Sequence, residues 1–101
     1  LEGCTEKIRG NFNCFANNLT SLKGCPVKVG GYFYCSNNSL ISLEGCPTNI
    51  RGNFDCSVNK LTSLKGCPTK VGRDFFCSRN SVKFTKEDVM ELCDVKKHIS
   101  V

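Results

Sequence analysis

The segment FYCSNNSLISL, residues 33–43, and its copy FDCSVNKLTSL, residues 54–64, decide the fold. Shifting the sequence against itself by 21 residues aligns four such units without a gap, at 1–21, 22–42, 43–63 and 64–84. A short fixed period indicates one structural unit stacked on its neighbours, because so short a unit cannot bury its own apolar side alone. The sequence therefore predicts a repeat solenoid of four repeats, followed by residues 85–101 as a separate C-terminal piece.

Apolar residues recur at the same six places in each repeat, and each place forms a column. The columns are Leu1, Leu22, Leu43, Leu64; Cys4, Cys25, Cys46, Cys67; Ile8, Val29, Ile50, Val71; Phe12, Phe33, Phe54, Phe75; Cys14, Cys35, Cys56, Cys77; and Leu19, Leu40, Leu61, Val82. We expect each column to become a stripe of side chains stacked inside the coil.

One short segment of each repeat alternates apolar Phe and Cys with polar or outward-facing residues. These segments are 11–14, 32–35, 53–56 and 74–77. A period of two is typical of a short strand, and strands one repeat apart would pair side by side as a parallel sheet. Pro26, Pro47 and Pro68 lack an amide hydrogen, so the Gly-Cys-Pro segments are bends or extended connections.

One polar column contains Asn17, Asn38, Asn59 and Asn80. An inward Asn side chain has two donors and an acceptor, so it satisfies backbone groups left unpaired where the chain leaves the strand. We expect this column to be structural.

Residues after Phe84 break the repeat. Thr85 precedes Glu87 and Asp88 as a variant of the capping box, and Val89, Leu92 and Cys93 fall on one face of a helix. The pattern predicts a helix that runs to about Cys93 or Val95 and covers the open end of the last coil.

The phrase F-x-C-S-x-N-x-L-x-S-L resembles the L-x-V-S-N-N-x-L-x-x-L core of short bacterial leucine-rich repeats, over residues 1 to about 84. Phe and Cys replace the two strand residues of that core, Cys-Pro follows the Leu-x-Gly corner, and one extra residue precedes the strand. The repeats are also similar to cysteine-bearing repeats of bacterial and large-phage proteins. The resemblance implies a right-handed coil with a parallel sheet on one face. It also implies a protein-binding solenoid, used as an effector or inhibitor against a host protein in the cytoplasm of a bacterium or an infected bacterial host.

Eight of the nine cysteines, from Cys4 to Cys77, are spaced alternately by ten and eleven residues through the repeats, and Cys93 lies outside this series; none forms the local C-x-x-C pairs typical of zinc sites. The total number is odd and no signal-peptide pattern precedes the first repeat, which favours a reducing compartment. We expect buried free thiols and neither a metal nor another cofactor; disulfides across a coil and metal binding by stacked thiols are the alternatives.

Catalytic residues are scarce. The chain has a single histidine, His98, as a base for a cysteine nucleophile, and Asp55 and Asp74 are the only candidate carboxylate pair. No phosphate-binding glycine motif joins a strand to a helix. We expect no enzymatic activity and no catalytic site.

The residues that break the repeat are the candidates for partner binding. On and beside the predicted strand face they are Arg9, Tyr32, Tyr34, Arg51, Asp55, Asp74 and Phe76. Tyr and Arg are the residue types that carry much of the energy of protein interfaces, although β-propensity alone also favours aromatic residues on strands. A protein partner that docks on this face is the leading hypothesis.

A second candidate is the basic C-terminal half, which includes Lys65, Lys70, Arg73 and Arg79. Nucleic-acid or nucleoprotein binding there, with base stacking on Tyr32, Tyr34 and Phe76, is the alternative function. A third possible function is that of a structural segment of a longer repeat array. The uncapped N-terminal coil would also allow self-association. The longest apolar runs are a few residues, so no membrane span is expected.

Overall fold

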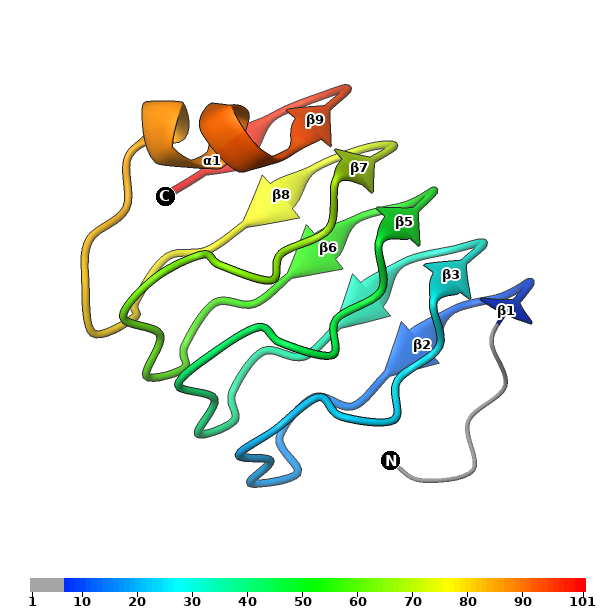
Figure 1. The fold of residues 1–101 in the computed structure, drawn as a ribbon, viewed down its shortest axis with the longest axis horizontal. Coiled ribbons are helices and arrows are strands. Elements are labelled where there is room, and N and C mark those ends of the chain that lie inside the picture. Colours follow the sequence, from blue (N-terminus) through cyan, green and yellow to red (C-terminus); the bar gives the residue numbers. More distant parts are fainter. Residues whose placement is uncertain (1–6) are drawn as a thin grey trace.

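The computed structural model describes residues 7–101 and is a β-solenoid of about four turns with parallel strands and one short C-terminal helix (Figure 1). Each repeat contributes one strand to each of two sheets. The elements are β1 (Lys7–Ile8), β2 (Phe12–Asn13), β3 (Lys28–Val29), β4 (Phe33–Tyr34), β5 (Asn49–Ile50), β6 (Phe54–Asp55), β7 (Lys70–Val71), β8 (Phe75–Phe76), α1 (Lys86–Leu92), β9 (Asp94–Val95) and β10 (Ile99–Ser100).

The first sheet, here the Phe sheet, has the order β10-β8-β6-β4-β2. Its strands lie inside the segments in which the sequence predicted strands, and Phe12, Phe33, Phe54 and Phe75 pair in register. The second, here the Lys sheet, has the order β1-β3-β5-β7-β9 and was not predicted. Each of its strands has a single inward apolar residue, so the sequence shows no alternation there, but these inward residues form the predicted Ile and Val column.

The core lies inside the coil and contains most of the predicted columns. Phe33, Phe54 and Phe75 are fully buried, and consecutive rings of the column lie 5.0–6.0 Å apart. The thiols of Cys14, Cys35 and Cys56 each donate to a carbonyl of the next coil, at 3.4 Å. Leu1 and Cys4 lie outside the described residues. The column prediction is confirmed for most of the remaining positions, with the exceptions given below.

The asparagine column is structural, as predicted, for three of its four members. The side chain of Asn59 donates to the carbonyl oxygens of Cys35, Cys56 and Ser57, and its Oδ1 accepts the Leu40 N–H at 3.0 Å. Asn38 and Asn80 repeat this pattern one coil on either side. Asn17, in the first coil, is exposed.

Residues 85–101 contain the predicted helix, α1, but the segment after it forms a further coil with two strands instead of a free tail. In the strand pairing Asp94 lies beside Lys70 and Ile99 beside Phe75, so both sheets continue with an offset of 24 residues instead of 21. The predicted capping box is confirmed: Thr85 Oγ1 accepts the Asp88 N–H at 3.1 Å, and Asp88 accepts the Thr85 N–H at 2.8 Å. The helix lies over the end of the repeats (Figure 1).

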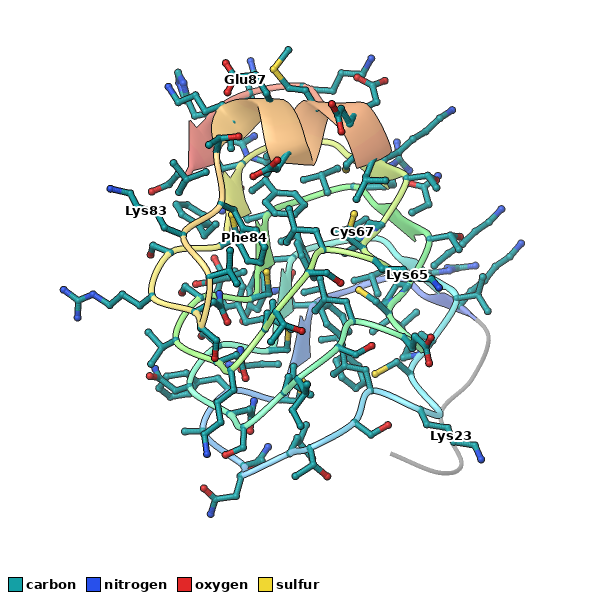
Figure 2. All side chains as sticks on the ribbon, turned by 60° about the vertical axis from the view of Figure 1, so that its left-hand side comes forward. Lys23, Lys65, Cys67, Lys83, Phe84 and Glu87 are labelled. Carbon is teal, nitrogen blue, oxygen red and sulfur yellow. The ribbon has the colours of Figure 1, made fainter. Side chains whose placement is uncertain are left out.

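The prediction that Val82 and Leu92 point inward is wrong. Val82 is 43% exposed and Leu92 is 50% exposed. Phe84 is buried below the helix, and Figure 2 shows it on the inner side of α1. The chain leaves the repeat after Asn80 to enter the helix. At this junction, therefore, neither the 21-residue period nor the helical period predicts which residues point inward. Phe84, Val89 and Cys93 supply the apolar contact there.

Candidate functional site

The outer face of the Phe sheet, here the Phe face, carries the predicted aromatic residues. Tyr32 and Tyr34 project from the second repeat with their rings stacked at 4.0 Å between centroids. Phe76 lies two strands away in the column of Tyr34, with Asp55 between them. All four residues are half-buried. Tyr34 also receives a long hydrogen bond from the Asn53 side chain, at 3.5 Å.

Several polar side chains of the Phe face accept hydrogen bonds from backbone N–H groups. Asn11 accepts the Tyr32 N–H, Asn53 accepts the Asp74 N–H and Asp74 accepts the His98 N–H, each at 3.0 Å. This ladder is interrupted at Tyr32, which occupies the same column but has no oxygen at that place. Asp55 accepts from the backbone N–H and the hydroxyl of Ser57. Asp55 and Asp74 thus have structural partners within the described chain.

Arg9 and Arg51 lie apart from the tyrosines. Both are exposed and directly follow strands of the Lys sheet, so they belong to the outer face of that second sheet. The set of seven residues that the sequence grouped as one partner surface is therefore divided between two faces. The strand alternation that placed Tyr32 and Tyr34 does not extend across the intervening turn.

The outer face of the Lys sheet, here the Lys face, has two neighbouring columns of outward residues. The first column is Lys7, Lys28, Asn49, Lys70 and Asp94, which follow from the strand register. The second, two residues further along each strand, is Arg9, Gly30, Arg51, Gly72 and Lys96. Asp94 is the one carboxylate in these columns, and it pairs with Lys96 at 3.1 Å.

Glycines leave two hollows in the Lys face. A Cβ on Gly30 would collide with the Arg9 carbonyl oxygen, and a Cβ on Gly72 would collide with that of Arg51, so close packing of the coils requires glycine there. The hollow over Gly30 has a volume of about 590 Å³ and is lined by Lys7, Arg9, Lys28, Asn49 and Arg51. The hollow over Gly72, of about 320 Å³, is lined by Asn49, Arg51, Lys70 and Lys96.

The sequence missed the Lys face, although a signal was present. Six of the 14 Lys and Arg residues lie in its two columns with the single Asp94, so this face has the same net charge, +5, as the whole chain. Lys7, Lys28 and Lys70 recur at the repeat period, and Arg9, Gly30, Arg51 and Gly72 alternate two residues later. Reading the charged residues by column instead of by chain half would have identified the face.

The predicted basic surface of the C-terminal half is not one patch. Lys70 belongs to β7, and Arg73 lies in the turn before β8. Lys65 lies in the Leu-Lys-Gly-Cys corner and Arg79 in the loop after β8, where its φ is 56°. Lys65 projects from the outside of the coil on one side of the view in Figure 2, and Lys83 projects on the opposite side. Only Lys70 joins the hollows described above.

Of the eight cysteines in residues 7–101, five are buried and three are half-buried, and no disulfide joins any two of them. Burial raises the pKa of the Cys67 and Cys77 thiols from 9.0 to about 11, and that of Cys93 to about 12. Burial, with a contribution from neighbouring thiols, also raises the pKa of Cys35, Cys46 and Cys56 well above 9.0. These six thiols are therefore protonated at neutral pH, whereas the thiolate is the form that acts as nucleophile and metal ligand. Within the described chain no three His, Cys, Asp or Glu residues gather as metal ligands would.

Fold and surface together define a cysteine-rich β-solenoid with an aromatic outer face on one sheet and a basic outer face on the other. Its one helix in residues 7–101 is too short to cross a membrane. No protein-family model, curated protein or solved structure matches the chain. The residues of the two faces are therefore the basis for any statement about function.

Proposed function

We propose that this protein is a binding module without enzymatic activity that docks on another protein through its Phe face. The observation that supports this most directly is the pair Tyr32 and Tyr34. Tyr32 occupies a column in which Asn11, Asn53 and Asp74 supply a hydrogen-bond acceptor to the next coil, so it removes a stabilising contact. A residue retained for folding alone would be Asn or Asp at that place.

The composition of the face agrees with this proposal. Near the stacked tyrosines lie the exposed Asn13 and the half-buried Ser57 and Ser78. Tyr supplies a large, rigid contact area at a low cost in conformational entropy, and Ser and Asn supply adaptable hydrogen bonds, which is the combination found in antibody paratopes. Phe15, which is 50% exposed in the first coil, extends the aromatic area.

The experiment is affinity capture from extracts of the cells that make the protein, with three versions of the chain. The test variant combines Tyr32→Asn with Tyr34→Asn, because Asn is the residue found in the first repeat at both places, Asn11 and Asn13. The control is Ile41→Thr, which replaces an apolar side chain that is 60% exposed by the Thr found one repeat away on either side.

We expect the wild type and the Ile41→Thr chain to capture the same protein, with an affinity that changes little with salt. The double Tyr variant should bind it several hundredfold more weakly, since two interface tyrosines at about 2 kcal/mol each contribute about 4 kcal/mol. Equal capture by all three versions would show that the Phe face is not the docking surface.

A further inference from the structure

We infer that the Lys face binds the phosphate backbone of double-stranded nucleic acid, independently of base sequence. This goes beyond the protein docking proposed above and does not depend on it, because it uses the other sheet. The inference rests on three features of the Lys face: its charge, the chemistry it lacks, and the spacing of its cations.

Charge gives the class of ligand. Lys7, Arg9, Lys28, Arg51 and Lys70 are all exposed on the face, and Lys96 adds a sixth cation that is neutralised by Asp94 at 3.1 Å. Arg51 lines both hollows and lies centrally. Its planar guanidinium donates in pairs to phosphate oxygens, and the lysines act as mobile point charges around it.

The residue types that the face lacks argue against two other partners, single-stranded nucleic acid and a protein. Its two columns contain no aromatic residue, whereas sites for single-stranded nucleic acid combine a basic groove with side chains on which bases stack. Tyr32, Tyr34 and Phe76 lie on the other sheet. Protein interfaces have an apolar core from which charged residues are depleted, but the apolar residues of these strands point inward. A strongly positive, polar surface is typical of contacts with nucleic-acid duplexes.

The dimensions fit a duplex backbone. The two columns run across five parallel strands, so the face extends about 19 Å at 4.7–4.9 Å per strand. One strand of a duplex has a phosphate every 3.4 Å along the axis, which places about five or six phosphates over that length. The two glycine hollows are two strands apart, about 9.5 Å, and each is bordered by cations from both columns. Arg9, Lys28, Arg51 and Lys70 are exposed along this length, so the phosphates within reach are sufficient to pair with each of them.

The number of contacts gives a quantitative test by fluorescence anisotropy with a short labelled DNA duplex. Four phosphate contacts, from Arg9, Lys28, Arg51 and Lys70, predict a slope of about −3.6 for log K against log salt concentration, which is roughly a 150-fold loss of affinity between 50 and 200 mM salt. Arg51→Gln removes one contact, so its slope should be about −2.7 and its loss over the same range roughly 40-fold. Changing the base sequence of the duplex should not alter either value.

The control is Lys83→Gln, which removes one charge from the loop before the helix, where Lys83 projects away from the coil (Figure 2). This variant should keep the wild-type slope. An equal reduction by Lys83→Gln, or no reduction by Arg51→Gln, would overturn the assignment to the Lys face. Tighter binding of the corresponding single strand, or of poly-glutamate, would overturn the choice of a duplex. The Tyr32→Asn, Tyr34→Asn variant should bind the duplex like wild type, so failure of either proposal is recognised separately.

Discussion

Replacing Asn59 by Ala removes the most buried side chain of the asparagine column formed by Asn17, Asn38, Asn59 and Asn80. Asn59 is 8% exposed, and its side chain makes four hydrogen bonds to the backbone of two coils. A simple count of lost bonds would overestimate the effect, because the carbonyl groups are shared. The Cys35 carbonyl also accepts from Asn38, and the Cys56 carbonyl also accepts from Asn80.

The main cost of Asn59→Ala therefore falls on the Leu40 N–H, which loses its acceptor in a fully buried residue. An unsatisfied buried donor costs about 1–3 kcal/mol, and weakening of the remaining contacts adds about 1 kcal/mol. We expect the free energy of unfolding to fall by about 2–4 kcal/mol. Asn59→Asp should cost more at neutral pH, since a carboxylate still accepts from Leu40 but faces three carbonyl oxygens to which it has no proton to donate.

The assay is urea denaturation of the reduced protein, followed by circular dichroism, for these variants and for Asn17→Ala. Asn17 belongs to the same column but is exposed, so its replacement should change the free energy of unfolding by less than about 0.5 kcal/mol. Lowering the pH should protonate the Asn59→Asp side chain and recover part of its loss. Equal effects of Asn59→Ala and Asn17→Ala would refute the interpretation of the asparagine column as a buried structural network.

Two further predictions concern backbone strain and the thiols. Val58 has a φ of 53°, in the left-handed region that a β-branched residue occupies at a cost of about 1–2 kcal/mol. Val58→Asn should therefore raise the free energy of unfolding by about 1 kcal/mol, and the reverse change at the equivalent Asn37 should lower it; stabilisation by both changes would contradict this account. Burial raises the pKa of the Cys67 thiol to about 11 in the folded protein, from an ordinary value of 9.0 in the unfolded chain. Below pH 9 both states are protonated, and between pH 9 and 11 only the unfolded chain ionises, so stability should fall over that range. Denaturation at stepped pH should show a smaller fall for Cys67→Ala; an unchanged profile would contradict the burial of this thiol.

The sequence predicted the parts of the fold that repeat and point inward. The Phe and Asn columns, the strands near Phe33 and Phe54, and the Thr85 capping box follow from periodicity and local hydrogen bonding alone. Inward positions are predictable in this way because every coil must fill the same volume with the same contacts.

The parts that failed depend on how the chain continues across a change of period. The segment DVKKHISV at 94–101 matches KVGRDFFC at 70–77 only when an offset of 24 residues is allowed, because the helix inserts three residues. Few of the residues are identical, so self-comparison at 21 residues does not detect it. The pairing of Lys70 with Asp94 and of Phe75 with Ile99 needs the tertiary structure.

The Lys face contains a second period that the coil itself does not require. The backbone repeats every 21 residues, but Arg9, Gly30, Arg51 and Gly72 alternate over two coils, so that cations recur at about 9.5 Å with a hollow between them. Packing explains the glycines, because a Cβ would meet the carbonyl of the preceding arginine. It does not explain why the intervening residues are Arg9 and Arg51, whose side chains are exposed. A cation at every second coil beside an open hollow places positive charge within reach of a ligand in the hollow, and this argues that the arginines serve binding.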